Sequence, residues 1–336
     1  MKKHNRRITA ILSIVIFLLL LIDAKTVIQG AKEGVELCVK SVIPSLFPFI
    51  VASYYLNTNM MGMNLKLFSP IGMLLKLPRG YESILIPAYL GGYPVGAQCV
   101  NEAYVNGAIS KQEARRLMGF CSNAGPAFIF GFGSLLFSQH SRLLILWVIH
   151  ILSSVLVSFT IPVKPQEAKL PTPKESTLPD ALTKGIRSMA SVCGWVVLFR
   201  SVIAWTEQLL SLGTSSSLSI ALAGFLELTN GCVSLLQTDN ESIRFLLFSL
   251  FISFGGLCVY MQTVSAAKNA GAGYYFPGKI LQSSIAYFLT VIAEAVIYSD
   301  SFRVTVSPMI SAVFLLLGLT SFFFIKNSSN REKNVV

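Results

Sequence analysis

Charged side chains are scarce in this chain. Asp, Glu, Lys and Arg together make up 13% of its 336 residues, whereas hydrophobic residues make up 53%. A soluble domain carries about a quarter charged residues, so this chain has too few of them to cover its surface in water. Its long apolar segments predict an all-α, multi-pass integral membrane protein, because a helix satisfies its own backbone hydrogen bonds inside a bilayer.

The residue patterns of enzymes and metal sites are also lacking. The six cysteines include no Cys-x-x-Cys pair, and the three histidines are scattered along the chain. No His-Glu-x-x-His, Gly-x-Ser-x-Gly or phosphate-binding-loop spacing occurs. We therefore expect packed, inert thiols and no catalytic residues, metal or cofactor.

Basic residues outnumber acidic ones by 27 to 16, which gives a formal net charge of +11. Their positions nevertheless argue against a nucleic acid as partner. They gather at the ends of apolar segments: before the first segment, in one short loop around Lys111, and beyond the last segment. This placement is typical of membrane proteins, whose cytoplasmic loops are enriched in Lys and Arg. The expected partner is the lipid bilayer.

The apolar segments predict eight transmembrane helices and two re-entrant hairpins. A basic start precedes the first segment, as in a signal peptide, but no convincing cleavage site follows it, so we expect an uncleaved span. Residues 64–77 are too interrupted to cross and are expected at the interface, while Ser110 and Glu113 predict a capping box. The spans are expected at 8–22, 40–56, 117–138, 141–161, 186–206, 243–264, 279–298 and 305–325, and the hairpins at 83–108 and 217–236.

The order of these segments repeats. Each half contains a span, a broken hairpin, a Gly-broken span and a further span. With the N-terminus inside, the two repeats begin on opposite faces, which is the inverted arrangement of many secondary transporters. The expected division is an N-terminal helix at 1–29, a first repeat at 30–161, a Pro-rich cytoplasmic linker at 162–182, a second repeat at 183–300, and a C-terminal helix with a basic tail at 301–336.

Polar interruptions rich in Gly and Pro lie within these apolar segments. A bilayer tolerates non-helical backbone only where protein or a water-filled cavity pairs the freed N–H and C=O groups. The interruptions therefore predict a solute site at membrane depth. The candidate substrate-binding residues are Gly91, Gly92, Tyr93, Gln98, Ser122, Asn123 and Gly125 in the first half, and Arg200, Glu227, Asn230 and Gln262 in the second.

Arg200 and Glu227 are ionisable residues inside apolar runs. Each would cost about 3 kcal/mol at a lipid-facing helix centre, so each must face the protein interior and find partners. One interpretation pairs them with each other as a structural ion pair. The other makes Arg200 the countercharge of an anionic solute, with Glu227 binding the solute, a proton or a cation.

Four motifs resemble the YlbJ/SpoVV family of sporulation integral membrane proteins, within the broader group that carries a nucleoside-recognition (Gate) domain. They are Gly92-Tyr-Pro-Val-Gly-Ala97, Gly107-Ala-Ile-Ser-Lys-Gln-Glu-Ala114, Phe120-Cys-Ser-Asn-Ala-Gly-Pro126 and Leu226-Glu-Leu-Thr-Asn-Gly231. The resemblance spans about residues 30 to 300. It implies a bacterial membrane protein of the cell membrane or of the outer forespore membrane.

The resemblance further implies passage of dipicolinate from the mother cell toward the forespore. Dipicolinate is a flat pyridine with two carboxylates, so a small organic anion is the expected substrate. The N–H groups exposed at the Gly-rich breaks could each receive a carboxylate, Arg200 could neutralise charge, and Tyr93 could face the ring. A nucleoside or other organic-solute carrier and a non-transporting structural protein remain the alternatives. Protein partners and coupling to H⁺ or Na⁺ stay open.

Overall fold

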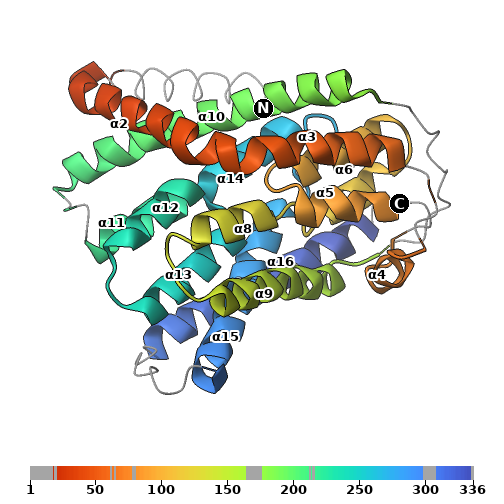
Figure 1. Cartoon of the computed structure of the whole chain (residues 1–336). Coiled ribbons are helices and arrows are strands. Elements are labelled where there is room, and N and C mark those ends of the chain that lie inside the picture. Colours follow the sequence, from red (N-terminus) through yellow and green to blue (C-terminus); the bar gives the residue numbers. More distant parts are fainter. Residues whose placement is uncertain are drawn as a thin grey trace.

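A computed structural model of the chain (Figure 1) describes residues 18, 21–60, 63, 66–77, 81–163, 176–211, 213, 216–297 and 308–333. These residues form helices joined by turns and short loops, with no β-strand among them. The predicted all-α class is therefore confirmed. Most of the span predicted at 8–22 lies outside the described residues.

Six segments of the described residues are long and apolar enough to cross a membrane. They are Ala24–Met60, His140–Thr160, Leu178–Leu209, Glu241–Ala266, Tyr275–Ile297 and Pro308–Ser328. Large apolar side chains such as Leu198 and Ile292 are exposed on them, as expected of surfaces that face lipid tails. The protein is thus a multi-pass membrane protein, as predicted.

Two long helical segments pack side by side along the top of the molecule in Figure 1. One is formed by α2 (Ala24–Leu37), a π-helical turn η1 (Cys38–Val42) and α3 (Ile43–Met60), and the other is α10 (Leu178–Leu209). Small residues allow the close approach, since a Cβ on Gly34 would lie 2.8 Å from Val197 Cα. Gly30 lies against Ser201, further along α10, so the two segments run antiparallel.

Four helix pairs are each interrupted by a short non-helical stretch. These pairs are α5 (Leu85–Leu90) with α6 (Val95–Val105), α7 (Lys111–Met118) with α8 (Pro126–Gly133), α11 (Ser217–Leu226) with α12 (Leu228–Ser234), and α13 (Glu241–Phe254) with α14 (Gly256–Ala266). The stretches between them, near residues 91–94, 119–125, 227 and 255–256, are called breaks 1 to 4 below.

The break predicted within the 117–138 span is confirmed. The segment is divided between α7, which ends at Met118, and α8, which begins at Pro126. Gly125 is extended, with φ −76° and ψ 156°. Pro126 has no backbone N–H, so it can start a helix but cannot continue the hydrogen-bond ladder of a preceding one.

The remaining helices close the other side of the molecule. They are α4 (Ser69–Leu74), η2 (Glu82–Ile84), α9 (His140–Thr160), η3 (Leu235–Gln237), α15 (Tyr275–Ile297) and α16 (Pro308–Lys333). The buried guanidinium of Arg142 on α9 donates to Glu294 on α15, and the Ser242 hydroxyl at the start of α13 donates to the same carboxylate at 2.9 Å. This ion pair joins three helices at one end of the bundle.

The capping box predicted at Ser110 is half correct. The Ser110 hydroxyl accepts from the Glu113 N–H at 3.2 Å, as expected. The Glu113 carboxylate, however, binds the Arg116 guanidinium at 2.8 to 3.1 Å instead of the Ser110 N–H. A guanidinium forms two charge-assisted hydrogen bonds with a carboxylate and outcompetes a single backbone donor.

The linker predicted at 162–182 also ends earlier than expected. Thr177 and Asp180 form a full capping box, which starts α10 at Leu178. Most of the Pro-rich linker lies outside the described residues. The sequence pattern placed the start of this span at 186 because Asp180 and Lys184 interrupt the apolar run, whereas both are tolerated in the first turns of a helix at a membrane surface.

Basic side chains gather at the end of the bundle where α6, α10 and α14 approach one another. The Asn101 side chain accepts from the N–H groups of Asn269 and Ala270, and Tyr274 N–H donates to Arg115 O, so these segments meet there. The basic residues of this end are Lys111, Arg115, Arg116, Lys184, Arg187 and Lys268. The positive-inside rule predicts that this basic end faces the cytoplasm.

The packing of break 1 against break 2 gives a stability prediction. A Cβ on Gly96 would lie 1.8 Å from the Cys121 carbonyl oxygen, whereas a Cβ on Gly131, also in a helix, would meet nothing within 4 Å. We expect Gly96→Ala to lower the midpoint of thermal unfolding by several degrees, and Gly131→Ala to leave it unchanged or to raise it. Thermal unfolding of the two purified variants measures this, and equal midpoints would contradict the packing described.

Candidate functional site

Breaks 1 to 3 and α14, which begins at break 4, line one small cavity, called the central cavity below. Its volume is about 30 Å³, which is room for one or two water molecules. Its walls are completed by η1 and α3 on one side and by α10 on another. The lining residues are Val42, Leu46, Tyr93, Ala124, Gly125, Phe128, Val192, Val196, Glu227, Leu228, Thr229, Val259 and Gln262.

Glycines let the breaks approach one another in pairs. Break 1 lies on break 2, where a Cβ on Gly125 would be 3.0 Å from Gly92 N. Break 3 lies on break 4, where a Cβ on Gly256 would be 3.2 Å from the backbone of Glu227. Gly92, Gly255 and Gly256 have φ values of +75°, +83° and +79°, a region that L side chains rarely adopt.

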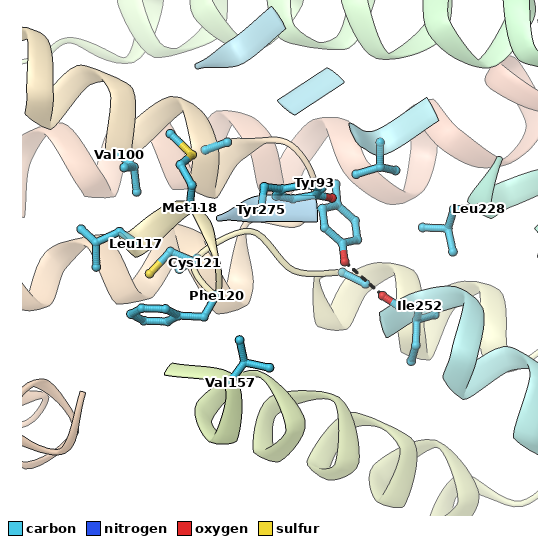
Figure 2. Close-up of a cluster of buried hydrophobic side chains, with 14 of the residues drawn as sticks. Tyr93, Val100, Leu117, Met118, Phe120, Cys121, Val157, Leu228, Ile252 and Tyr275 are labelled. Atoms are coloured by element: carbon cyan, nitrogen blue, oxygen red, sulfur yellow. Dashed lines mark hydrogen bonds between the residues drawn. The ribbon is translucent and has the colours of Figure 1, made fainter. Parts of the chain in front are cut away.

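Tyr93 joins the two halves of the chain at the central cavity. Its hydroxyl donates to the Ile252 carbonyl oxygen at 3.1 Å, as the dashed line in Figure 2 shows. This carbonyl lies in the last turn of α13 and has no helical partner of its own. Tyr93 also lines the cavity. One residue therefore pairs the carbonyl group freed before break 4 and contributes an aromatic side chain to the cavity wall.

A buried polar network lies directly behind this wall. Asn123 donates to the carbonyls of Phe120 and Ala88 at 2.7 and 3.2 Å, and so pairs two carbonyl groups near the breaks. The Ala124 N–H donates to His150 Nε2 at 3.1 Å. This bond requires an unprotonated Nε2, which leaves the ring proton on Nδ1, 3.3 Å from the Ser253 hydroxyl.

Lys279 is at the centre of this network. Its ammonium donates to Asn123 Oδ1 at 3.0 Å and to Gln282 Oε1 at 2.7 Å, and it lies over the rings of Tyr93 and Tyr275. Sequence reasoning missed Lys279 because it stands at the first residue of a predicted span, where a lysine is usually a flanking residue that reaches the surface. The nearby Gln282, three residues further along the same helix, was the available signal.

Glu227 faces the central cavity from break 3. Its side chain is buried, and its carboxylate accepts from the N–H and the side-chain amide of Asn230, both at 2.7 Å. Asn230 thus contributes through Glu227 and does not itself line the cavity. Because Glu227 is the N-cap of α12, its carboxylate both satisfies a freed backbone group and supplies polar atoms to the cavity wall.

A second, polar cavity shares the lining residue Gln262 with the first. It lies at the basic end and has a volume of about 330 Å³. We call it the vestibule. Its lining residues are Tyr54, Pro94, Gln98, Asn101, Glu102, Lys184, Arg187, Ser188, Ser191, Gln262, Ser265, Ala266 and Lys268. Predicted site residue Gln98 lies here, where its amide donates to the Ser188 hydroxyl at 3.0 Å.

Arg200 does not line the central cavity. It lies one helical turn beyond Val196 on α10, where its guanidinium binds Glu33 at 2.6 Å and Glu207 at 3.3 Å. The possible pairing with Glu227 is thus replaced by an ion-pair group between α2 and α10. The sequence could not reveal this, because Glu33 is far away in the chain and the face to which Arg200 points depends on the packing.

The other predicted residues lie at the breaks. Gly91 and Gly92 form the turn of break 1, and Gly125 lines the cavity. Ser122 is fully buried beside Asn123, and its hydroxyl has no hydrogen-bond partner among the described residues. The structure therefore brings together the predicted residues of breaks 1 to 3. Gln262 lines both the central cavity and the vestibule, Gln98 lines the vestibule, and Arg200 lies apart.

One relative supports the membrane assignment. The chain is 23% identical over 326 residues to the sporulation integral membrane protein YlbJ of Bacillus subtilis strain 168, in a match that covers 81% of this chain and 78% of YlbJ. No protein-family model and no solved structure matches the chain.

The vestibule predicts which positions of α10 water reaches. Ser191 lines the vestibule and Leu198, two turns further on, is 46% exposed on the outside of the bundle. We expect Ser191→Cys to react with a charged, membrane-impermeant thiol reagent added from the basic end. Leu198→Cys should not react, because the thiolate that reacts does not form in lipid. Mass spectrometry of labelled vesicles measures both, with the unsubstituted protein as background, and equal labelling would contradict a water-filled vestibule.

Proposed function

This chain is a relative of YlbJ, a sporulation integral membrane protein, and we propose that it is a transporter of a small organic anion, with dipicolinate as the substrate. The observation that carries the proposal is the packing of four helix breaks at one place, beside a small cavity that shares Gln262 with a polar vestibule. Broken helices in membranes occur where the backbone lines a solute or ion site.

In this proposal the two halves form an inverted repeat. The α5–α6 and α11–α12 pairs are re-entrant hairpins, and α7–α8 and α13–α14 are crossings broken near mid-membrane. The close approach of Gly231 to Gly224 supports the second hairpin, since a Cβ on Gly231 would lie 2.3 Å from Gly224 Cα. The approach of Gly96 to Ala88 at 3.2 Å supports the first. With an N-terminal span before Ala24, the chain then has eight transmembrane helices.

The chemistry of the central cavity suits a flat, polar solute. An aromatic face comes from Tyr93, hydrogen-bonding groups come from Gln262 and Thr229, and the apolar remainder comes from valines and leucines. The mixture of one ring, a few polar atoms and apolar walls is typical of sites for small organic molecules. Dipicolinate, a planar pyridine with carboxylates at both sides of its nitrogen, offers a ring face and polar edges to these groups once the cavity opens beyond the about 30 Å³ of this state.

Access from one side supports transport by alternating exposure. The vestibule lies at the basic end and shares its lining residue Gln262 with the central cavity. At the other end of α10, the Arg200 group ties this helix to α2, and Glu207 in turn accepts a hydrogen bond from the Ser219 hydroxyl of α11. We interpret this arrangement as a state open toward the cytoplasm and closed on the opposite face.

Uptake into proteoliposomes tests the function. We expect saturable uptake of dipicolinate, weaker uptake of benzene-1,3-dicarboxylate, which lacks the ring nitrogen, and little uptake of uridine. Preferred uptake of uridine would instead support a nucleoside carrier. No uptake of any of the three by folded protein would support a structural role.

Two matched substitutions test whether dipicolinate passes through the central cavity. Val192→Phe adds volume to a residue that is 3% exposed and lines the cavity, whereas Val233→Phe adds the same volume at a residue that is 37% exposed. We expect the first variant to lose at least tenfold in dipicolinate uptake per folded protein, with a midpoint of thermal unfolding lowered by overpacking, and the second to transport normally with an unchanged midpoint. Normal transport by Val192→Phe would place the solute elsewhere.

A further inference from the structure

The surroundings of Lys279 set it apart from the other buried basic residues. Its side chain is 1% exposed, and its neighbours are the amide oxygens of Asn123 and Gln282 and two tyrosine rings. By contrast, the buried Arg116 and Arg142 each bind a glutamate. Among the described residues no carboxylate lies within ion-pair distance of the Lys279 ammonium.

The cost of such a charge is high at membrane depth. A buried ammonium with neutral partners keeps the attraction of amide dipoles and of ring faces, but it lacks the opposite charge that usually compensates a buried ion. Lys279 therefore lacks an opposite charge, which a carboxylate in the adjoining cavity would supply. The Tyr93 ring, whose centroid is 5.1 Å from Lys279 Nζ, also lines the central cavity, so Lys279 lies one side chain behind the cavity wall.

The one buried carboxylate at the cavity lies away from Lys279. Glu227 is held at break 3 by Asn230, while Lys279 lies behind breaks 1 and 2 with Asn123. The two side chains form no ion pair with each other. The wall near Tyr93 is therefore favourable for negative charge, and the wall near Glu227 is unfavourable for it.

We propose that Lys279 is the countercharge that makes the site select anions, with the solute carboxylate placed on the Tyr93 side of the central cavity. This inference rests on the proposed transport function and assigns to Lys279 the role that the sequence suggested for Arg200. The substrate class is then a carboxylate attached to a planar ring, whose ring lies near Tyr93 and whose charge lies toward Lys279.

Three substitutions test this role through charge and through packing separately. Lys279→Met removes the charge and keeps most of the side-chain length. Gln282→Glu keeps Lys279 and gives it an internal carboxylate in place of an oxygen now 2.7 Å from the ammonium. Gln282→Met is the control, because like Gln282→Glu it removes the two hydrogen bonds that the Gln282 amide donates to Asn123 and His150, and it adds no charge.

We expect Lys279→Met and Gln282→Glu each to raise the KM for dipicolinate at least tenfold, and Gln282→Met to keep the wild-type preference for dipicolinate over uridine. Dipicolinate should also raise the midpoint of thermal unfolding in the wild type and in Gln282→Met, but not in the other two variants. Arg200→Gln should keep the preference and lower only the stability.

The possible results distinguish a failure of the proposed Lys279 role from a failure of the proposed transport function. Wild-type protein that transports dipicolinate, together with a Gln282→Glu variant that does so equally well, would show that Lys279 only ties helices together and would overturn the inference alone. Wild-type protein that carries anions and uridine with equal efficiency would also overturn it and leave the transporter in place. Neither flux nor thermal stabilisation by any solute in the wild type would overturn both.

Discussion

The structure depends on one constraint: backbone groups freed by a helix break inside a membrane must be paired by the protein, because lipid offers no hydrogen bonds. At each break, the chain packs against a neighbouring break, or a buried side chain pairs with the freed backbone groups. Tyr93 donates to a carbonyl at the end of α13, His150 accepts from Ala124, Asn123 donates to Phe120, and Glu227 accepts from Asn230. The breaks are stable only together, so they must meet in one place.

This constraint also explains why the centre of the protein is polar. The side chains that pair the freed backbone groups are amides, an imidazole, a phenol and a carboxylate, and several of them face the central cavity or lie directly behind its wall. A site for a polar solute therefore arises from the same residues that stabilise the breaks. Around it, the long α2–α3 and α10 helices and the Arg142–Glu294 ion pair hold the outer spans in place.

The sequence predicted the features that depend on local chemistry. The breaks at Gly91-Gly92 and at Asn123 were visible because Gly, Pro and amide residues interrupt apolar runs. The Ser110 cap was visible because its partner is three residues away. The pairing of Arg200 with Glu33 could not be predicted, since it depends on which faces of α2 and α10 pack together. The pairing of Glu113 with Arg116 is local, three residues apart on α7, and was overlooked. Lys279 was missed because its position suggested a surface residue, while the rings of Tyr93 and Tyr275 pack against it and bury it.

The central claim is that a solute binds where the four breaks meet. A cryo-electron-microscopy structure of the full chain, held by an antibody fragment and saturated with dipicolinate, would test it most directly. The account predicts density for one planar ligand between Tyr93, Gly125 and Gln262, with a carboxylate on the side of Lys279. A well-resolved central cavity without ligand, or dipicolinate bound only elsewhere on the protein, would contradict it.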